Sequence, residues 1–348
     1  MNRKDEHLHN ARSQQLKTMP NDFDEVRLVA SSFPKAGSST NKVDLTTNFG
    51  ELTLTSPFYL NAMTGGSALA SSLNERLGII SRELDLMLAL GSLSAGLKDP
   101  ELLESYRIAR KINPQGFIWL NLSADSSVEK VLRGVDALQA NGVQLHLNLP
   151  QELVMPEGDR NFNDWLSNIA LIQEQLNLPV LVKETGFGMS PQTLALLAEA
   201  GVEYVDVSGR GGTNFIAIEN ARRVQHEYRY LTDYGLSTVE SLLNVAAVPH
   251  SFKVTASGGI RQPIDMVKAL MLGADATAIA GTLLPTLMKE DGLPATLALL
   301  QGYQEQLRHL YVLLGVTTTA ELKGLPLLFS EKINNYQQQL PKFLPSDS

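Results

Sequence analysis

The chain has 348 residues, of which 43% are hydrophobic and 19% are charged, and its formal net charge at pH 7 is −8. This is the composition of a globular protein, and it lacks both the basic character that nucleic-acid binding normally needs and any apolar run of about eighteen residues that would span a membrane. Cysteine is absent, which excludes disulfides, thiolate nucleophiles and thiolate zinc sites.

Residues 1–56 are predicted to form an extension that precedes the main domain. Residues 1–19 have the pattern of a polar helix, on which Arg3, Lys4 and His7 are neighbours because side chains three and four residues apart share a face. Two cations and an imidazole on one face suit a phosphorylated ligand, and a solvated terminal helix is the alternative. Residues 43–54 form two alternating runs around Asn48-Phe49-Gly50, which predicts a hairpin that plugs the bottom of a barrel.

From residue 57 onward, eight short apolar runs alternate with segments of helical periodicity. The runs are PFYLNAMTGG, LMLALGSLS, FIWLNLS, VQLHLNL, PVLVKETG, EYVDVSGRGG, FKVTASGGIR and ATAIAG. The helical segments between them are residues 71–84, 100–112, 127–141, 162–176, 191–200, 238–248 and 263–272, and further helix is expected at 283–314. Eight β/α units without a composition break predict an α/β fold, a single TIM (β/α)8 barrel over residues 57–348. An open doubly wound sheet is the alternative, but no G-x-G-x-x-G follows the first run.

The fourth strand ends in a cluster of polar residues. Alternation along the strand places His146 and Asn148 on the side opposite its apolar residues. Gln151 and Glu152 follow directly after Pro150, on the loop that leaves the strand. Barrels of this kind carry their active sites at the C-terminal ends of the strands, so four convergent polar groups predict a site there. A half-buried strand with a polar rim is the alternative.

Small residues at the ends of the last strands indicate a phosphate site. Glycines let backbone N–H groups approach an anion, and barrels frequently bind phosphate at their last two loops. The residues with this pattern are Gly258, Gly259, Arg261, Ala280 and Gly281, with Thr213 on the sixth loop. A glycine pair can also simply close a turn.

A second group of strand-end residues would surround a flat heterocycle. It comprises Met63, Thr64, Ser92, Asn121 and Lys183. An unpaired lysine is costly to bury in an apolar strand, so Lys183 is expected to face Glu184, another carboxylate or an anionic ligand. Beside a flavin, such a lysine stabilises the anionic reduced ring, and an internal Lys–Glu pair is the alternative.

Longer motifs occur in a fixed order along the chain. They are RKDEH, NAMTGG, HLNLPQE, VKETGFG, SGRGGTNF with IENAR, and ASGGIRQPIDMVKALMLGAD followed by AIAG. In this order the chain resembles the type 2, FMN-dependent isopentenyl-diphosphate isomerases over nearly its whole length. The resemblance implies FMN kept reduced by NADPH or NADH, a need for Mg²⁺, and interconversion of isopentenyl and dimethylallyl diphosphate in isoprenoid biosynthesis. Because no strong side-chain acid belongs to the set, reduced flavin is expected to take part in proton transfer with no net redox change.

The resemblance also assigns roles by position. FMN contacts are implied for Ala62, Met63, Thr64, Ser92, Asn121, Lys183, Thr213, Gly259, Arg261, Ala280 and Gly281, with Ser208 and Gly258 beside them. Substrate contacts are implied for Arg3, Lys4, His7, Ser92, Ser94 and Gln151, catalytic positions for Gln151, His146 and Asn148, and Mg²⁺ ligation for Glu152. Members of the family often show GSQR after the second strand. Here Leu93 and Ser94 stand at its last two positions, so their substrate contacts are left open.

Two other functions remain as alternatives. An FMN barrel that oxidises a hydroxy acid or dihydroorotate would need a base on a late loop, where the chain offers His226 without a matching arginine motif. A non-catalytic barrel that binds a phosphorylated metabolite is the third possibility. The resemblance and the polar N-terminus favour a cytoplasmic homotetramer or homooctamer with a small diphosphate substrate and no nucleic-acid or membrane partner. The RKDEH helix must then fold over the barrel mouth or reach a neighbouring subunit.

Overall fold

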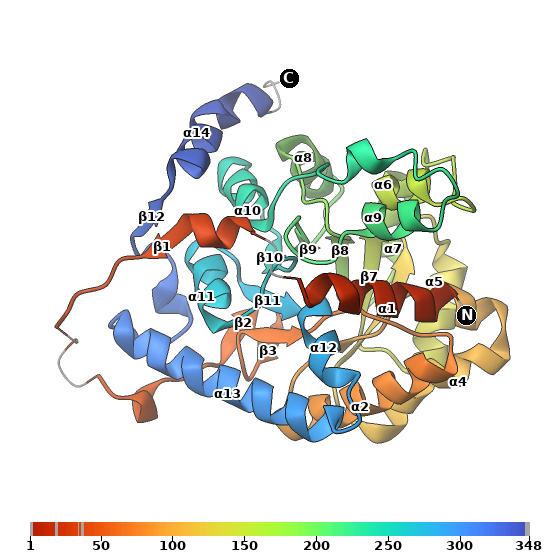
Figure 1. Ribbon diagram of the computed structural model, residues 1–348, viewed down its shortest axis with the longest axis horizontal. Coiled ribbons are helices and arrows are strands. Elements are labelled where there is room, and N and C mark those ends of the chain that lie inside the picture. The colour runs from red at the N-terminus through yellow and green to blue at the C-terminus, as the bar shows by residue number, and fades with distance from the viewer. Residues whose placement is uncertain (1–2, 18–19, 34, 36–37, 345–348) are drawn as a thin grey trace.

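Eight parallel strands close into a barrel at the centre of the computed structural model, which describes residues 3–17, 20–33, 35 and 38–344 (Figure 1). The strands are β4 (Phe58–Leu60), β5 (Leu88–Ala89), β6 (Ile118–Ser123), β7 (Gly142–Leu147), β8 (Val180–Glu184), β9 (Tyr204–Asp206), β10 (Lys253–Ala256) and β11 (Ala276–Ile279). Neighbours follow chain order, and the pairing of β11 with β4 closes the ring. The predicted TIM barrel is therefore confirmed, and the open sheet is excluded.

Helices surround the barrel at the predicted positions (Figure 1). They are α2 (Ala68–Leu84), α4 (Pro100–Ile112), α5 (Val128–Leu138), α7 (Trp165–Gln175), α8 (Pro191–Glu199), α10 (Thr238–Ala247) and α11 (Pro263–Met271), followed by α12 (Leu284–Leu287) and α13 (Gly292–Leu313). Five of them begin after a Ser or Asp whose side chain accepts a first-turn N–H, which satisfies a donor that the helix itself cannot pair. Three short helices lie in the loops after the strands: α3 (Ser94–Lys98), α6 (Leu149–Val154) and α9 (Phe215–Ala221).

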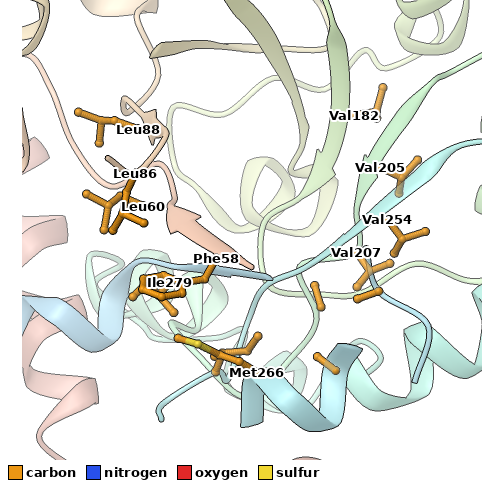
Figure 2. Close-up of a cluster of buried hydrophobic side chains, with 14 of the residues drawn as sticks. Phe58, Leu60, Leu86, Leu88, Val182, Val205, Val207, Val254, Met266 and Ile279 are labelled. Carbon is orange, nitrogen blue, oxygen red and sulfur yellow. The ribbon is translucent and has the colours of Figure 1, made fainter. Parts of the chain in front are cut away.

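The main core lies between the barrel and the helices. Alternate strand residues such as Leu60, Val205 and Val254 are fully buried there, and Figure 2 shows them in one cluster with Met266 of α11. Because these apolar side chains point outward, their strand neighbours point into the barrel. The last inward-facing residue of each strand therefore lies at the mouth of the barrel, which is the end where the strands have their C-termini.

A hairpin closes the bottom of the barrel, as the sequence predicts. Strands β2 (Thr47–Phe49) and β3 (Leu52–Leu54) pair antiparallel, and Phe49 is fully buried. Its ring centroid lies 4.9 Å from that of Tyr204, in a cluster with Trp119 and Leu181 at the N-terminal ends of the strands. The lower end of the barrel is therefore filled with side chains, and only the upper end is left for a ligand.

The N-terminal helix α1 (Arg3–Gln15) lies across the C-terminal ends of the strands of its own barrel, in front of them in Figure 1. Leu8 and Ala11 bury its apolar side in the main core, and polar contacts hold it on both flanks. Gln14 accepts a hydrogen bond from the Asn214 N–H and donates one to the Asn214 carbonyl, at 2.8 and 3.1 Å. Asp5 accepts a hydrogen bond from Ser67 at the start of α2. The predicted polar helix is confirmed for residues 3–15, whereas residues 1–2 and 18–19 lie outside the described part of the chain.

A small sheet that the sequence analysis did not predict joins the two ends of the chain. Strand β1 (Val26–Leu28) pairs antiparallel with β12 (Leu327–Phe329), and α14 (Glu331–Gln339) follows β12. The short 3-10 helix η1 (Asp22–Glu25) leads directly into β1. No helix in the described ranges is long and apolar enough to cross a membrane.

Candidate functional site

A cavity of about 450 Å³ lies where the C-terminal ends of the barrel strands meet α1. Every residue for which the resemblance implied an FMN, substrate, catalytic or Mg²⁺ contact lines it, from Arg3, Lys4 and His7 on α1 to Ala280 and Gly281 after β11. Substrate contacts of Leu93 and Ser94 in the GSLS segment were left open, and the structure separates the two residues. Ser94 lines the cavity, whereas Leu93 is buried in the apolar core.

Glycines after β9 and β10 form one end of the cavity. Gly258 and Gly259 have φ angles of 86° and 75°, which L-residues with a side chain rarely adopt. A Cβ on Gly258 would lie 2.0 Å from the Gly209 carbonyl oxygen, and one on Gly259 would lie 3.1 Å from the Gly211 Cα. The loops that follow β9 and β10 are packed backbone to backbone. Because their glycines have no side chains, the backbone N–H groups at this end of the cavity can be approached by an anion such as a phosphate.

Arg261 lines the same end, but its guanidinium is engaged elsewhere. It donates to both oxygens of Asp24 at 2.6 and 3.2 Å and to Asp265 at 3.3 Å. The side chain thus holds η1 against the glycine loop, and Asn21 adds a hydrogen bond to the Gly259 carbonyl at 2.8 Å. Arg261 therefore supports the glycine-lined end of the cavity, and its guanidinium is paired with carboxylates outside it.

Lys183 lies at the floor of the cavity and is buried. Its Nζ donates to the backbone carbonyl of Glu184 at 2.5 Å, and its register partner on β9 is Asp206. Burial lowers the pKa of Lys183, and the charges of Asp206 and Glu184 oppose that effect. The alternative of an internal Lys–Glu side-chain pair is wrong, because the Glu184 carboxylate accepts the N–H groups of Thr185 and Phe187 instead.

Asp206 is a buried carboxylate that the sequence analysis missed. It accepts hydrogen bonds from Asn61 at 2.8 Å, from Ser257 at 2.8 and 2.9 Å, and from the Ser208 N–H at 3.1 Å. Three donors favour the ionised form although burial raises the pKa of Asp206. The available signal was an aspartate at an inward-facing position of the strand next to Lys183.

The polar groups at the end of β7 converge as predicted. His146 Nδ1 lies 2.8 Å from the amide oxygen of Asn121, and Asn148 donates to Glu152 at 2.8 Å. The other Glu152 oxygen accepts the Asp159 N–H at 2.9 Å. Burial, together with nearby lysines, lowers the pKa of His146 to about 3, so its imidazole is neutral at neutral pH.

The basic face of α1 reaches the cavity beside these groups. Burial and the neighbouring Arg3 lower the pKa of Lys4 to about 8. Arg3 donates to Glu157 at 3.2 Å, and His7 Nε2 lies 3.1 Å from a Glu219 oxygen. These contacts place two cations and an imidazole opposite the end of β7.

Glu219 on α9 is the second carboxylate to which the sequence analysis gave no role. It is fully buried behind the cavity wall, accepts a hydrogen bond from Gln151 Nε2 at 2.8 Å, and forms an ion pair with Arg222 at 2.5 Å. Burial works to raise the pKa of Glu219, but the contact with His7 and the hydrogen bonds from Gln151 and Arg222 outweigh it and lower the pKa to about 2. An acid and an arginine three residues apart in IENAR were the available signal.

His226 does not line the cavity. Its Nδ1 lies 2.7 Å from the Asn220 carbonyl oxygen, within the loop that follows α9. The base required by the hydroxy-acid oxidoreductase alternative is therefore not supplied by this histidine.

Comparisons with known proteins agree with this geometry. A family model described as FMN-dependent dehydrogenase matches residues 85–327. A flavocytochrome b2 mutant with pyruvate bound superposes with a TM-score of 0.65 at 18% identity, covering 100% of this chain and 86% of that chain. A mandelate oxidase mutant with a monooxide FMN adduct gives a TM-score of 0.61 at 16% identity, covering 93% and 92%. The chain belongs to the FMN-dependent dehydrogenase family of β/α barrels.

Closer relatives narrow this assignment. An isopentenyl-diphosphate delta-isomerase from Staphylococcus aureus is 43% identical over 337 residues, which is 97% of this chain and 95% of the relative. The same enzyme from the JH9 strain is equally similar. Within the broader class, the chain is a member of the isopentenyl-diphosphate delta-isomerases.

The cavity fits the FMN that this family implies. Thr64 Oγ1 and Asn148 Oδ1 line it and are buried without a hydrogen-bond partner among the described residues. Unpaired buried polar atoms are rare in native proteins, so a polar ligand is expected to pair with them. Gly258 and Gly259 would hold the phosphate of FMN, and Lys183 would lie beside its ring.

We expect Gly259→Ala to weaken FMN binding at least tenfold, about 1.4 kcal/mol. The added Cβ meets the Gly211 backbone, and the positive φ adds strain of about 1–2 kcal/mol. Flavin fluorescence titration of the apoprotein measures the affinity. Gly273→Ala is the matched control, because Gly273 has a φ of 109° with no atom near the added Cβ and lies away from the cavity. Equal flavin affinity in the two variants would refute the assignment of the glycine end.

Proposed function

We propose that this protein interconverts isopentenyl diphosphate and dimethylallyl diphosphate, using reduced FMN and Mg²⁺, with no net redox change. The observation that carries the proposal is that the basic face of α1 and the amides at the end of β7 face each other across the cavity whose floor is Lys183. The identity of the substrate is inferred from the names of the relatives, which are isopentenyl-diphosphate delta-isomerases. NADPH or NADH as reductant, assembly as a homotetramer or homooctamer, and a cytoplasmic location are proposed from the family resemblance.

The diphosphate would bind between α1 and the end of β7. Arg3 and Lys4 carry positive charge, and Lys4 with a pKa of about 8 is mostly protonated at pH 7. A diphosphate would raise that pKa further, because an anion favours the charged form of the lysine. The neutral His146 donates its single N–H from Nδ1 to the Asn121 oxygen, so its Nε2 can accept a hydrogen bond, and the ring is not an imidazolium acid at neutral pH.

FMN would lie over Lys183 with its phosphate at Gly258 and Gly259. When bound, reduced FMN supplies an electron-rich ring that can deliver a proton to the alkene and stabilise the positive charge that follows. Lys183 would balance negative charge on the reduced ring; burial lowers the pKa of Lys183, and Asp206 and Glu184 oppose that shift without reversing it. The closed mouth beneath α1 would exclude water from the reacting carbons.

Gln151 would orient the substrate rather than supply the proton. Its Nε2 donates to the Glu219 carboxylate, so the amide is fixed with its oxygen as the remaining polar atom. An amide does not ionise at neutral pH, but a fixed carbonyl oxygen can accept or position a proton.

Glu152 is the proposed Mg²⁺ ligand. Mg²⁺ is usually held by one or two carboxylates together with substrate phosphates, and it keeps several waters. Among the described residues no cluster of three or more His, Asp or Glu side chains could hold a metal alone, which suits an ion that binds with the diphosphate. The bound ion would neutralise charge on the diphosphate oxygens.

The reaction itself is tested directly by NMR. The protein is loaded with FMN, reduced anaerobically and mixed with isopentenyl diphosphate and Mg²⁺ in D₂O. Deuterated dimethylallyl diphosphate is the expected product. Absence of this product, together with oxygen consumption on addition of a hydroxy acid, would replace the proposal with the oxidoreductase alternative.

We expect Gln151→Ala to lower kcat by about 10²–10⁴-fold, the usual contribution of a group that acts on proton transfer. FMN affinity should stay within twofold, because the proposed contacts of FMN lie on other residues. Steady-state kinetics and flavin titration measure the two effects. Gln192→Ala, in an exposed glutamine of α8, should match the unaltered protein. Unchanged kcat in Gln151→Ala would remove this residue from the mechanism.

We expect Glu152→Gln to raise the Mg²⁺ concentration for half-maximal activity about tenfold or more, because a neutral amide is a weaker ligand for a hard cation. A Mg²⁺ titration at saturating substrate measures this. Glu129→Gln, at an exposed position of α5, controls for the loss of one negative charge. The ligand assignment fails should both variants give the titration curve of the unaltered protein.

A further inference from the structure

Arg222 joins three parts of the site without lining the cavity. It stands at the end of α9, where its Nη1 lies 2.5 Å from a Glu219 oxygen and its Nη2 lies 2.6 Å from a Glu157 oxygen. Its Nε lies 3.9 Å from Glu6 on α1. The side chain is 15% exposed and is not among the cavity-lining residues. Any effect of Arg222 on a ligand is therefore exerted through other side chains.

Each strong partner of Arg222 holds residues that do line the cavity. Glu219 accepts the hydrogen bond from Gln151 at 2.8 Å and lies 3.1 Å from His7. Glu157 accepts a hydrogen bond from Arg3 at 3.2 Å. The guanidinium of Arg222 therefore reaches Gln151 and His7 through the Glu219 carboxylate, and it reaches Arg3 through the Glu157 carboxylate.

We infer that Arg222 is a positioning residue, which fixes Gln151 on one side of the bound diphosphate and Arg3 and His7 on the other. The inference rests on the proposed isomerase function. A planar guanidinium binds two carboxylates at once in fixed directions, whereas the three donors of a lysine ammonium rotate freely and do not fix those directions. The arginine therefore fixes geometry as well as charge.

The charge of Arg222 also keeps Glu219 ionised. The groups that face Glu219 are Lys4 and His7 from α1, the uncharged Gln151 from α6, and Arg222 on its own helix, with Glu157 and Glu6 on the far side of the guanidinium. A buried carboxylate that loses its cation takes up a proton at higher pH. The protonated acid would hold Gln151 and His7 less firmly.

The test compares Arg222→Met with Arg223→Met in FMN-loaded protein. Arg223 is a matched control, because it adjoins Arg222 but pairs with Glu227 at 2.5 Å, lies over the Tyr228 ring, and donates to the Val154 carbonyl. We expect Arg222→Met to raise KM for isopentenyl diphosphate about tenfold. The acidic limb of its kcat/KM profile should move up by about one to three pH units, because the pKa of Glu219 rises when the cation is lost. Arg223→Met should change neither.

Calorimetric binding of inorganic pyrophosphate separates this inference from the proposed function. Arg222→Met should bind pyrophosphate about tenfold more weakly than Arg223→Met, while the FMN affinity of both stays unchanged. If the unaltered protein fails to isomerise isopentenyl diphosphate, the proposed function falls, and the pyrophosphate comparison still reports on Arg222. Equal KM, pH profile and pyrophosphate affinity in the two variants would overturn the inference.

Arg222→Lys covers the case in which Arg222→Met does not fold. The lysine retains the charge but not the two-sided geometry. The acidic limb should therefore stay near that of the unaltered protein while KM and pyrophosphate affinity worsen. If Arg222→Lys leaves KM and pyrophosphate affinity unaltered, the planar guanidinium that binds two carboxylates is not needed. That result would contradict the positioning role.

Discussion

The common direction of the eight barrel strands is the constraint on which the site depends. Because every strand runs the same way around a closed ring, residues more than two hundred positions apart, such as Thr64 and Gly281, end at one mouth. The other end is filled by Phe49 and the hairpin that carries it. A ligand site can therefore form only at the mouth, and α1 completes it from above. The chemistry then depends on which side chains each strand end presents.

Buried charges at the mouth come in balanced sets. Lys183 shares the floor with Asp206, and Glu219 lies between Arg222 and the basic face of α1. An isolated buried charge would shift its pKa until it became neutral, so each of these groups requires the others to remain ionised. The positive charges nearest the cavity, on Arg3, Lys4 and Lys183, leave it suited to an anionic ligand. This balance agrees with the proposed flavin and diphosphate.

The sequence predicted the barrel and the residues that line its cavity because both follow from local patterns. Inward-facing polar residues at strand ends, such as Asn121 and His146, are visible from alternation and from the position of the loop that follows. Partnerships across the barrel were not visible. Asp206, Glu219 and Arg222 act through side chains from other strands and helices, and no spacing rule links Arg222 to Arg3. The β1–β12 pair was missed for the same reason, because two three-residue strands some 300 positions apart carry no local signal.

The pairing of β12 with β1 has a consequence for the far end of the chain. Strand β1 follows η1, whose Asp24 holds Arg261, while Asn21 just before η1 holds the Gly259 carbonyl. Lys332 of α14 adds an ion pair to Asp22. The C-terminal elements β12 and α14 thereby support the loop proposed to hold the flavin phosphate, although they lie outside the cavity. Shortening or tagging the carboxyl terminus would therefore act on cofactor retention before it acted on the barrel.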